Sequence, residues 1–201
     1  MIRVLLAEDQ AMVRGAIAAL LELEDDLQVV AEVGDGDDAV RAAIEHRPDV
    51  ALLDIEMPGL DGLDAAARLH CELPDCVVLI LTTFGRPGFL RRAMQAGAAG
   101  FLVKDGPAAD LAAAIRRALA GERVIDAGLA ATALTEGPNP LSTREREVLA
   151  ASADGSTVAD IAGEVFLSEG TVRNYLSAAI QKVGARNRVE AVHNARERGW
   201  L

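Results

Sequence analysis

The chain has 201 residues, enough for one large domain or two small ones. Hydrophobic residues make up 51% of it but aromatic residues only 3%, which suits alanine-rich helices packed closely on a sheet. A net charge of −11 argues against a protein that coats nucleic acid regardless of sequence. No apolar run is long enough to cross a bilayer, and Glu8 and Asp9 follow the first apolar run too closely for a signal peptide, so we expect a cytoplasmic protein.

Charge is divided unevenly along the chain. Residues 1 to 120 hold 20 acidic and 11 basic residues, a net of −9, whereas residues 168 to 201 hold three acidic and six basic residues, a net of +3. Two segments of opposite charge indicate two domains with different partners.

The first 120 residues alternate short apolar runs with helical patterns five times. The apolar runs lie at 2–7, 28–33, 50–54, 77–82 and 100–104, and the helical patterns at 11–24, 36–46, 61–71, 88–96 and 107–121. Five successive βα units predict an α/β fold with a doubly wound, five-stranded parallel sheet. In the first helix, Val13, Ile17, Leu20 and Leu21 fall on the face that we expect to be buried.

The rest of the chain has a different pattern. Residues 121 to 140 are rich in turn-forming residues and carry no sustained period, which predicts a linker. After it only helical patterns occur, at 142–153, 157–164, 168–183 and 187–198. We therefore expect an α/β domain over residues 1–120, a linker over 121–140 and an all-α four-helix domain over 141–201.

Polar residues stand at the ends of four of the five predicted strands, namely Glu8 and Asp9, Asp54, Thr82 and Lys104. Ligands of an open parallel sheet bind outside the carboxyl ends of its strands, so we expect these five side chains to meet. Two carboxylates about 4 Å apart repel each other by roughly 4 kcal/mol at an effective dielectric near 20, and a cation would offset that repulsion. The natural candidate is Mg²⁺, which takes oxygen ligands from carboxylates and keeps positions open for water and phosphate.

Asp54 is the candidate for chemistry at this site. Aspartate can form an acyl phosphate, so we expect Asp54 to accept a phosphoryl group. Lys104 would then pair with the phosphoryl oxygens, and Thr82 would hydrogen-bond one of them. Taken singly, an aspartate at a strand end is more often a helix or turn cap, and only the common position of all five residues favours a site.

Four segments within residues 1 to 120 carry a family resemblance: "LLAEDQ", "LLDIEMPGLDG", "LILTT" and "GFLVKD". They resemble the receiver domain of bacterial two-component response regulators. The resemblance implies the flavodoxin-like strand order 2-1-3-4-5 and a sensor histidine kinase as the donor of the phosphoryl group that Asp54 accepts. It also implies that Mg²⁺ is held by Glu8, Asp9, Asp54 and the backbone carbonyl of Glu56.

 We expect this histidine kinase to be bound to a membrane.

Phe101 lies three residues before Lys104. The resemblance implies that this aromatic side chain swings inward when Thr82 moves toward the phosphate. A simple core position beside Leu102 is an equally good interpretation, and both can hold. The segment departs from the family at Asp105, where many receivers have proline.

Residues 157 to 183 read as two helices separated by a tight break at "FLS", and Ser168 is a suitable N-cap for the second. The buried stripe of the second helix consists of Val172, Leu176, Ile180 and Val183. Its outward positions carry side chains suited to the edges of bases in the major groove: Arg173, Asn174 and Ser177. Contacts to DNA phosphates are expected from Thr171, Lys182 and Arg188. A plain helical hairpin with solvated charges is the alternative.

The segment from "LSTREREVL" to "GARNRVEAV" resembles the LuxR-type DNA-binding domain over residues 141 to 201. The similarity includes Glu145, which braces the helices in that family. The sequence departs from the family at Ser177, a position that is often basic in its members. Together the two halves resemble the NarL/FixJ group of response regulators. Segments such as "AEDQAM", "TTFGRPGF" and "ERGWL" are most similar to its DesR subgroup, which implies control of fatty-acid desaturation; another membrane-stress or antibiotic-response operon is the alternative.

Two rival functions are weighed against a phosphorylated regulator. An aspartyl phosphatase would carry its nucleophile after the first strand with a second Asp two places on, and a flavin site would need a hydroxyl-rich or glycine-rich loop there, which "EDQ" does not provide. A regulator governed by protein contacts alone would not need the acidic site. We therefore expect a DNA-binding regulator and not an enzyme.

The first and fifth helices are expected to form a dimer face. Besides its buried residues, the first helix carries a second apolar stripe of Met12, Ala16, Ala19 and Leu23. The fifth is expected to expose Ala108, Ala112 and Ala113. Small side chains allow close packing across a two-fold axis, so we expect a homodimer through these helices after phosphorylation, although the alanines also fit an alanine-rich composition.

Overall fold

The computed structural model describes residues 1–83, 85–104, 108–126, 128–131 and 139–201; at residues 108 and 109 it describes the backbone only. The chain divides into two compact units. The N-terminal unit comprises Met1–Gly85 and Leu90–Ala131, and the C-terminal unit comprises Arg86–Phe89 and Thr132–Leu201. Each unit has a hydrophobic core of its own.

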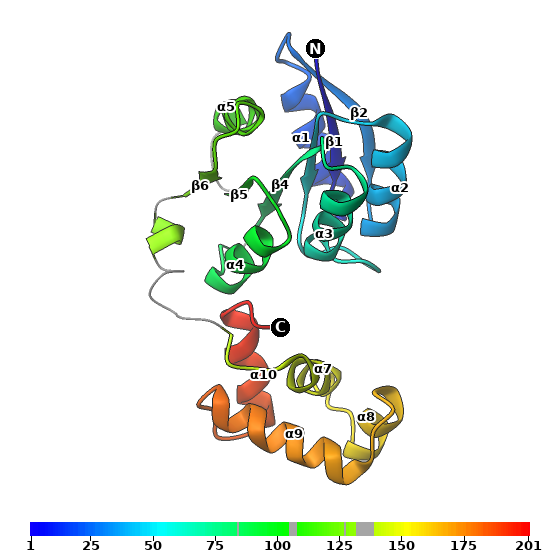
Figure 1. Cartoon of the computed structure of the whole chain (residues 1–201), viewed down its shortest axis with the longest axis vertical. Coiled ribbons are helices and arrows are strands. Elements are labelled where there is room, and N and C mark those ends of the chain that lie inside the picture. The colour runs from blue at the N-terminus through cyan, green and yellow to red at the C-terminus, as the bar shows by residue number, and fades with distance from the viewer. Residues whose placement is uncertain (84, 105–107, 127, 132–138) are drawn as a thin grey trace. The chain divides into compact units, whose positions relative to one another are not determined.

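A parallel sheet forms the centre of the N-terminal unit (Figure 1). Its strands are β1 (Ile2–Ala7), β2 (Leu27–Val33), β3 (Val50–Leu53), β4 (Val77–Thr82), β5 (Gly100–Val103) and β6 (Val124–Ile125). Their order is β2-β1-β3-β4-β5-β6, which confirms the predicted order of the first five strands. β6 is a sixth strand that the sequence did not predict, because two residues in a turn-rich segment are too few to show a period.

The helices of this unit are α1 (Ala11–Leu21), α2 (Gly36–His46), α3 (Gly62–Glu72), α4 (Pro87–Gln95) and α5 (Ala108–Leu119). α1 and α5 contribute to one core cluster with β1, β3 and β4, so they cover the same face of the sheet. All four residues of β3 are fully buried, as expected for a central strand covered on both faces. This burial explains why the run at Val50–Leu53 is apolar throughout.

Two expectations about buried helix faces were wrong. Leu21 is buried as predicted, but Leu20 is 42% exposed, because the buried line of α1 runs through Leu21 and Ala18, and Leu20 points away from that line. Ala112 is only 2% exposed and packs in the core beside Ile115, so it cannot belong to an exposed stripe on α5. Met12 and Leu23 are exposed as predicted.

The C-terminal unit is a four-helix domain, as predicted. Its helices are α7 (Thr143–Ala151), α8 (Val158–Glu164), α9 (Glu169–Lys182) and α10 (Arg188–Glu197). Each begins with a side-chain N-cap that accepts a hydrogen bond from the third helical residue: Ser142, Thr157, Ser168 and Asn187. None of the helices in the described ranges combines the length and the apolar character that a bilayer span requires.

Candidate functional site

Three carboxylates converge at the carboxyl ends of β1 and β3. The two strands pair in register from Val4 to Ala7, and the amide of Asp54 donates to the carbonyl of Ala7 at 2.9 Å, so Glu8, Asp9 and Asp54 follow neighbouring strand ends. One oxygen from each of these three side chains lies within 4.8 Å of the others. Glu8 is 1% exposed and Asp54 5%, whereas Asp9 is exposed. The sequence predicted this convergence.

Lys104 completes the group from the end of β5. Its Nζ lies 3.0 Å from Asp54 Oδ1 and 2.5 Å from Glu8 Oε2. The lysine is placed by the backbone, because its amide donates to the carbonyl of Thr82 at 2.8 Å. Both Lys104 Nζ and Glu8 Oε2 lack a well-oriented hydrogen bond among the described residues, so their short contact is an ion pair without hydrogen-bond geometry.

The electrostatics of the site favour a further cation. Burial raises the pKa of Glu8 above its usual range; the close contact with the Lys104 ammonium works against the rise, and the negative charge of Asp54 adds to it. One ammonium group therefore does not fully compensate the buried carboxylates. Three carboxylates with oxygens this close suit a hard divalent cation.

The remaining predicted residues of this site lie as follows. Thr82 is 2% exposed at the end of β4, beside the strand that leads to Lys104. Phe101 is fully buried opposite Ile80, which agrees with a core aromatic and leaves its switch role a prediction. Glu56 is exposed in the segment after β3, and Asp105 lies outside the described residues.

Two residues that shape the site were not predicted. The Arg14 guanidinium donates to the backbone carbonyl of Glu8 at 2.5 Å, and it holds the start of α1, whose N-cap Gln10 makes no side-chain cap bond. Gly62 begins α3 directly against the site, because a Cβ there would lie 1.8 Å from the carbonyl oxygen of Asp54. An arginine among apolar residues of α1 and the "PGLDG" turn were the available signals.

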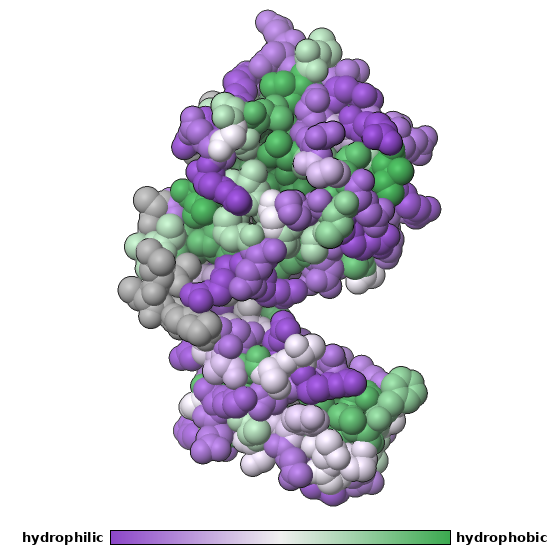
Figure 2. Space-filling view, viewed as in Figure 1, coloured by the Kyte–Doolittle hydropathy of each residue, from purple (hydrophilic) through white to green (hydrophobic). Residues whose placement is uncertain are grey.

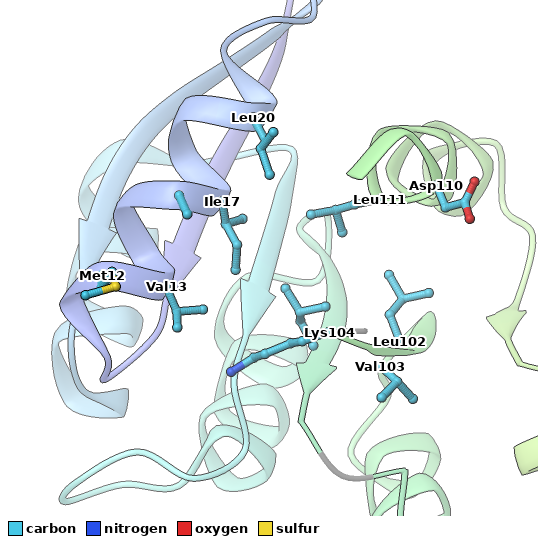
Figure 3. A pocket seen from close by; sticks show the side chains of 11 residues that line it. Met12, Val13, Ile17, Leu20, Leu102, Val103, Lys104, Asp110 and Leu111 are labelled. Atoms are coloured by element: carbon cyan, nitrogen blue, oxygen red, sulfur yellow. The ribbon is translucent and has the colours of Figure 1, made fainter. Parts of the chain in front are cut away.

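An apolar groove separates α1 from α5. It has a volume of about 400 Å³, and Figure 3 shows Val13, Ile17 and Leu20 of α1 pointing toward Leu111 of α5. Lys104 lines the same groove, so the groove borders the acidic site. Two residues of the predicted apolar stripe on α1, Met12 and Ala16, line this groove.

An ion-pair network joins α5 to the segment after α1. Arg116 Nε and Nη2 donate to the two carboxylate oxygens of Asp26 at 2.9 and 2.5 Å. Arg116 Nη2 also contacts Glu24 Oε2 at 2.6 Å. These bonds fix the second half of α5 relative to the end of α1.

In the C-terminal unit, α9 presents the predicted outward face. Arg173, Asn174 and Ser177 are exposed, while Val172 and Leu176 are buried. Arg173 Nη2 lies 2.5 Å from Glu169 Oε2, an exposed pair one helical turn apart that contributes little stability. Thr171 is half-buried, and its hydroxyl lies 2.8 Å from that of Ser168 at the start of the helix.

Two predicted phosphate contacts have partners inside the unit. Lys182 Nζ lies 2.7 Å from Glu145 Oε2, and Arg188 Nη1 donates to the carbonyl of Ser156 at 2.7 Å. Burial would raise the pKa of Glu145, but its bonds with Lys182 and Ser142 outweigh burial and lower it. Lys182 thus stabilises a buried carboxylate, which helical spacing alone could not reveal.

Comparison with known proteins gives two family matches. The response regulator receiver domain matches residues 4–116, and the luxR family of bacterial regulatory proteins matches residues 139–195. Over 201 residues, covering all of both chains, the protein is 47% identical to the uncharacterized transcriptional regulatory protein YvfU and 46% identical to the transcriptional regulatory protein DesR, both of Bacillus subtilis. The response regulator ChrA of a heme-sensing two-component system is similar in structure, with a TM-score of 0.58, 34% identity and coverage of 100% of this chain and 98% of its own.

Proposed function

This chain belongs to the bacterial response regulators that join a receiver domain to a LuxR-type DNA-binding domain, and we propose that a phosphoryl group on Asp54 controls its binding to promoter DNA. It is a transcriptional regulator and not an enzyme, like the relatives it resembles. The receiver would span residues 1–120, the linker 121–140 and the DNA-binding domain 141–201. One observation carries the proposal: a nearly buried Asp54 lies 3.0 Å from Lys104 beside two further carboxylates.

Asp54 would receive the phosphoryl group from a sensor histidine kinase, which we take to be membrane-bound. Glu8, Asp9, Asp54 and the carbonyl of Glu56 would hold Mg²⁺, which neutralises charge on the transferring oxygens when bound. Asp54 Oδ attacks phosphorus, and the P–N bond to the kinase histidine breaks, with its electron pair leaving on that nitrogen. Lys104, already beside Asp54, would pair with the new phosphoryl oxygens.

The new bonds would alter two other contacts. A phosphoryl group on Asp54 competes with Glu8 for the Lys104 ammonium, so the ion pair of 2.5 Å weakens. Thr82 would move to donate its hydroxyl to a phosphoryl oxygen, and the buried Phe101 would shift with it. Because Lys104 also lines the groove between α1 and α5, these changes reach that surface.

We propose that phosphorylated receivers pair through α1 and α5. The surface that supports this is the exposed edge of the groove, with Met12 87% and Leu20 42% exposed. Shifting an equilibrium from mostly monomer to mostly dimer takes up to about 5.5 kcal/mol of free energy. The new charge-assisted hydrogen bonds from the phosphoryl group to Thr82 and Lys104 can provide most of it. A dimer would place two copies of α9 on adjacent half-sites of DNA.

Sedimentation measurements of the wild type and of Ala16→Glu, with and without phosphate, test this dimer. Ala16 is exposed and lines the groove, so a glutamate there should leave the fold intact and prevent pairing. Phosphate-dependent dimers that persist in Ala16→Glu would exclude the α1–α5 face and point to the α4 side.

The similarity to DesR supports desaturation genes as the regulon, with another membrane-stress or antibiotic-response operon as the alternative.

At the DNA we propose that Arg173, Asn174 and Ser177 contact bases while Thr171, Lys182 and Arg188 contact the backbone. The exposure of the first three on α9 supports the first group. For Lys182 and Arg188, a phosphate contact would add to the intramolecular bonds that both already make. Sequencing of genomic DNA fragments retained by the phosphorylated protein, with Asp54→Asn as control, tests phosphate-dependent binding and identifies the promoters.

A further inference from the structure

The first part of the predicted linker packs on the N-terminal unit. Its strand β6 lies parallel to β5, with Val124 paired with Gly100 and Ile125 paired with Phe101. The amide of Val124 donates to the carbonyl of Ala99 at 3.1 Å, and its side chain is buried in the core of the unit. Figure 2 shows apolar side chains on the side of this unit where Figure 1 places β5 and β6. The start of the linker is therefore part of the packed unit.

Gly100 makes room for β6. A Cβ at this position would lie 2.7 Å from the carbonyl oxygen of Val124 and 2.6 Å from Leu79 Cδ2, so any other residue would push the two strands apart. Arg123 adds a contact just before β6, because its Nη1 donates to the carbonyl of Ala98. These contacts hold the start of the linker against β5, the strand that carries Phe101 and leads to Lys104.

Beyond β6, Leu129 reaches the segment that follows Thr82. Its amide donates to Asp126 Oδ1 at 2.9 Å, and its side chain is buried. A Cβ on Gly85 would lie 3.5 Å from Leu129 Cδ1 and 3.3 Å from Val103 Cγ2, so the two side chains meet at this glycine. Gly85 follows Thr82 by three residues, and Val103 pairs with Thr82 between β4 and β5. Leu129 therefore lies against the backbone that positions the Thr82 hydroxyl.

This packing opposes the movement that phosphorylation would require. When Thr82 moves toward a phosphoryl oxygen, the chain that continues to Gly85 moves with it. The space at Gly85 is filled, because an added Cβ would already be closer to Val103 than packed carbon atoms prefer. Displacement of this segment away from Leu129 loses the contact, and displacement toward Leu129 makes the atoms overlap. Either way the contact favours the unphosphorylated arrangement, in which Lys104 pairs with Asp54 and Glu8.

We propose that Ile125 and Leu129 of the linker are positioning residues for the phosphorylation of Asp54, and that they restrain it. Both lie outside the residues 4–116 that match the receiver family. They touch no reacting atom and act through β5 and through Gly85. Because coupling between two equilibria is reciprocal, phosphate on Asp54 loosens the same contacts of the linker. This inference rests on the proposed phosphorylation of Asp54.

The rate of phosphate uptake by the full-length protein tests the restraint, with acetyl phosphate and Mg²⁺ as reagents and intact mass at successive times as the measurement. Leu129→Ala removes the side chain against Gly85, so uptake should be about three- to tenfold faster than in the wild type. Leu129→Met keeps the apolar volume and should take up phosphate at the wild-type rate. Leu27→Ala is the matched control, because Leu27 is a buried leucine of β2, which β1, β3 and β4 separate from β5. Its rate should stay within about twofold of the wild type.

Hydrogen–deuterium exchange tests the reciprocal effect on the linker. In the wild type, the amide of Val124 should exchange faster when the protein is phosphorylated, whereas Asp54→Asn treated in the same way should show no change.

Three results would overturn the proposal. They are an uptake rate of Leu129→Ala at or below that of the wild type, an equal rise in Leu27→Ala, and unchanged exchange at Val124 in the phosphorylated wild type. A wild type that takes up no phosphate would instead refute the proposed function, and the inference with it. The two failures are distinguishable, because the second is seen in the wild type before any linker residue is changed.

Discussion

Arg14 shows how one residue outside the acidic cluster can control it. Its guanidinium holds the carbonyl of Glu8, and so fixes the peptide from which the Glu8 and Asp9 carboxylates extend. Nothing in the spacing of acidic residues revealed this bond, because it depends on the direction in which an arginine side chain folds back from α1. Side-chain direction within a helix is fixed only when the surrounding loops are in place.

Arg14→Gln should weaken Mg²⁺ binding by about tenfold, the range found when residues that orient metal ligands are replaced. Simple electrostatics predicts the opposite, because removing a positive charge near the site should tighten binding. Titration calorimetry measures the affinity, with Arg117→Gln as control, since Arg117 is an exposed residue of α5 paired with Glu122. Tighter binding by Arg14→Gln would exclude a positioning role.

Lys182→Met should destabilise the C-terminal unit by about 1 to 3 kcal/mol, because it leaves the Glu145 carboxylate buried without its cation. Fluorescence of Trp200, the only tryptophan of the chain and a core residue of this unit, reports its unfolding. In the Glu145→Gln background the same substitution should cost much less, which a double-mutant cycle measures. Equal costs in both backgrounds would mean that the pair contributes nothing.

The pH dependence of this unit follows from the lowered pKa of Glu145. A carboxyl whose pKa is lower in the folded state contributes stability above its usual pKa of 4.5, and that stability is lost as the pH falls through the lower folded value. The midpoint of the Trp200 transition should therefore fall on acidification below about pH 4.5 in the wild type, and less so in Glu145→Gln. A decline of equal size in both proteins would assign the acid sensitivity to other groups.

Arg173→Ala should weaken binding at a specific site by about 1 to 3 kcal/mol and relax base preference, since the residue is exposed on the outer face of α9. Lys182→Ala, measured below its unfolding temperature, should weaken all DNA alike and reduce the salt dependence. Binding titrations at two salt concentrations separate the two effects. Identical behaviour of both variants would show that the assignment of base and phosphate contacts on α9 is wrong.

At the scale of elements, the strand ends were predictable and the helix faces only partly so. Asp54 and Glu8 meet because parallel strands bring their carboxyl ends to one edge, a rule that needs no side-chain detail. Burial of Ala112 and exposure of Leu20 depend on how each helix is rotated on the sheet. In an alanine-rich helix, several rotations bury similar apolar area, so the sequence does not fix the rotation.

Gly62→Ala should disturb the segment after β3, because the added Cβ would lie 1.8 Å from the carbonyl oxygen of Asp54. We expect a loss of more than about 2 kcal/mol in the unfolding free energy of the N-terminal unit and reduced phosphate uptake. Gly15→Ala in α1 is the matched control: nothing lies within 4 Å of its Cβ, so it should be neutral or stabilising by up to about 1 kcal/mol. Equal stability of the two variants would mean that the segment after β3 relaxes freely.

At the scale of the whole molecule, the uneven charge along the chain indicated two domains, and the structure divides into two compact units, each with a hydrophobic core of its own. The strand β6 lies within the predicted linker, so part of that segment belongs to the N-terminal unit. The proposed signal passes from Asp54 through Lys104 to the groove between α1 and α5, and from the receiver dimer to paired copies of α9. Each step depends on the first one, phosphate on Asp54.

Intact-mass spectrometry after incubation with acetyl phosphate tests that first step most directly. The wild type should gain the mass of one phosphoryl group in the presence of Mg²⁺ and none after chelation, because the buried carboxylates need a cation to accept more negative charge. Asp54→Asn should gain none under either condition, since an amide cannot form an acyl phosphate. Labelling of Asp54→Asn to the same stoichiometry as the wild type would contradict the account.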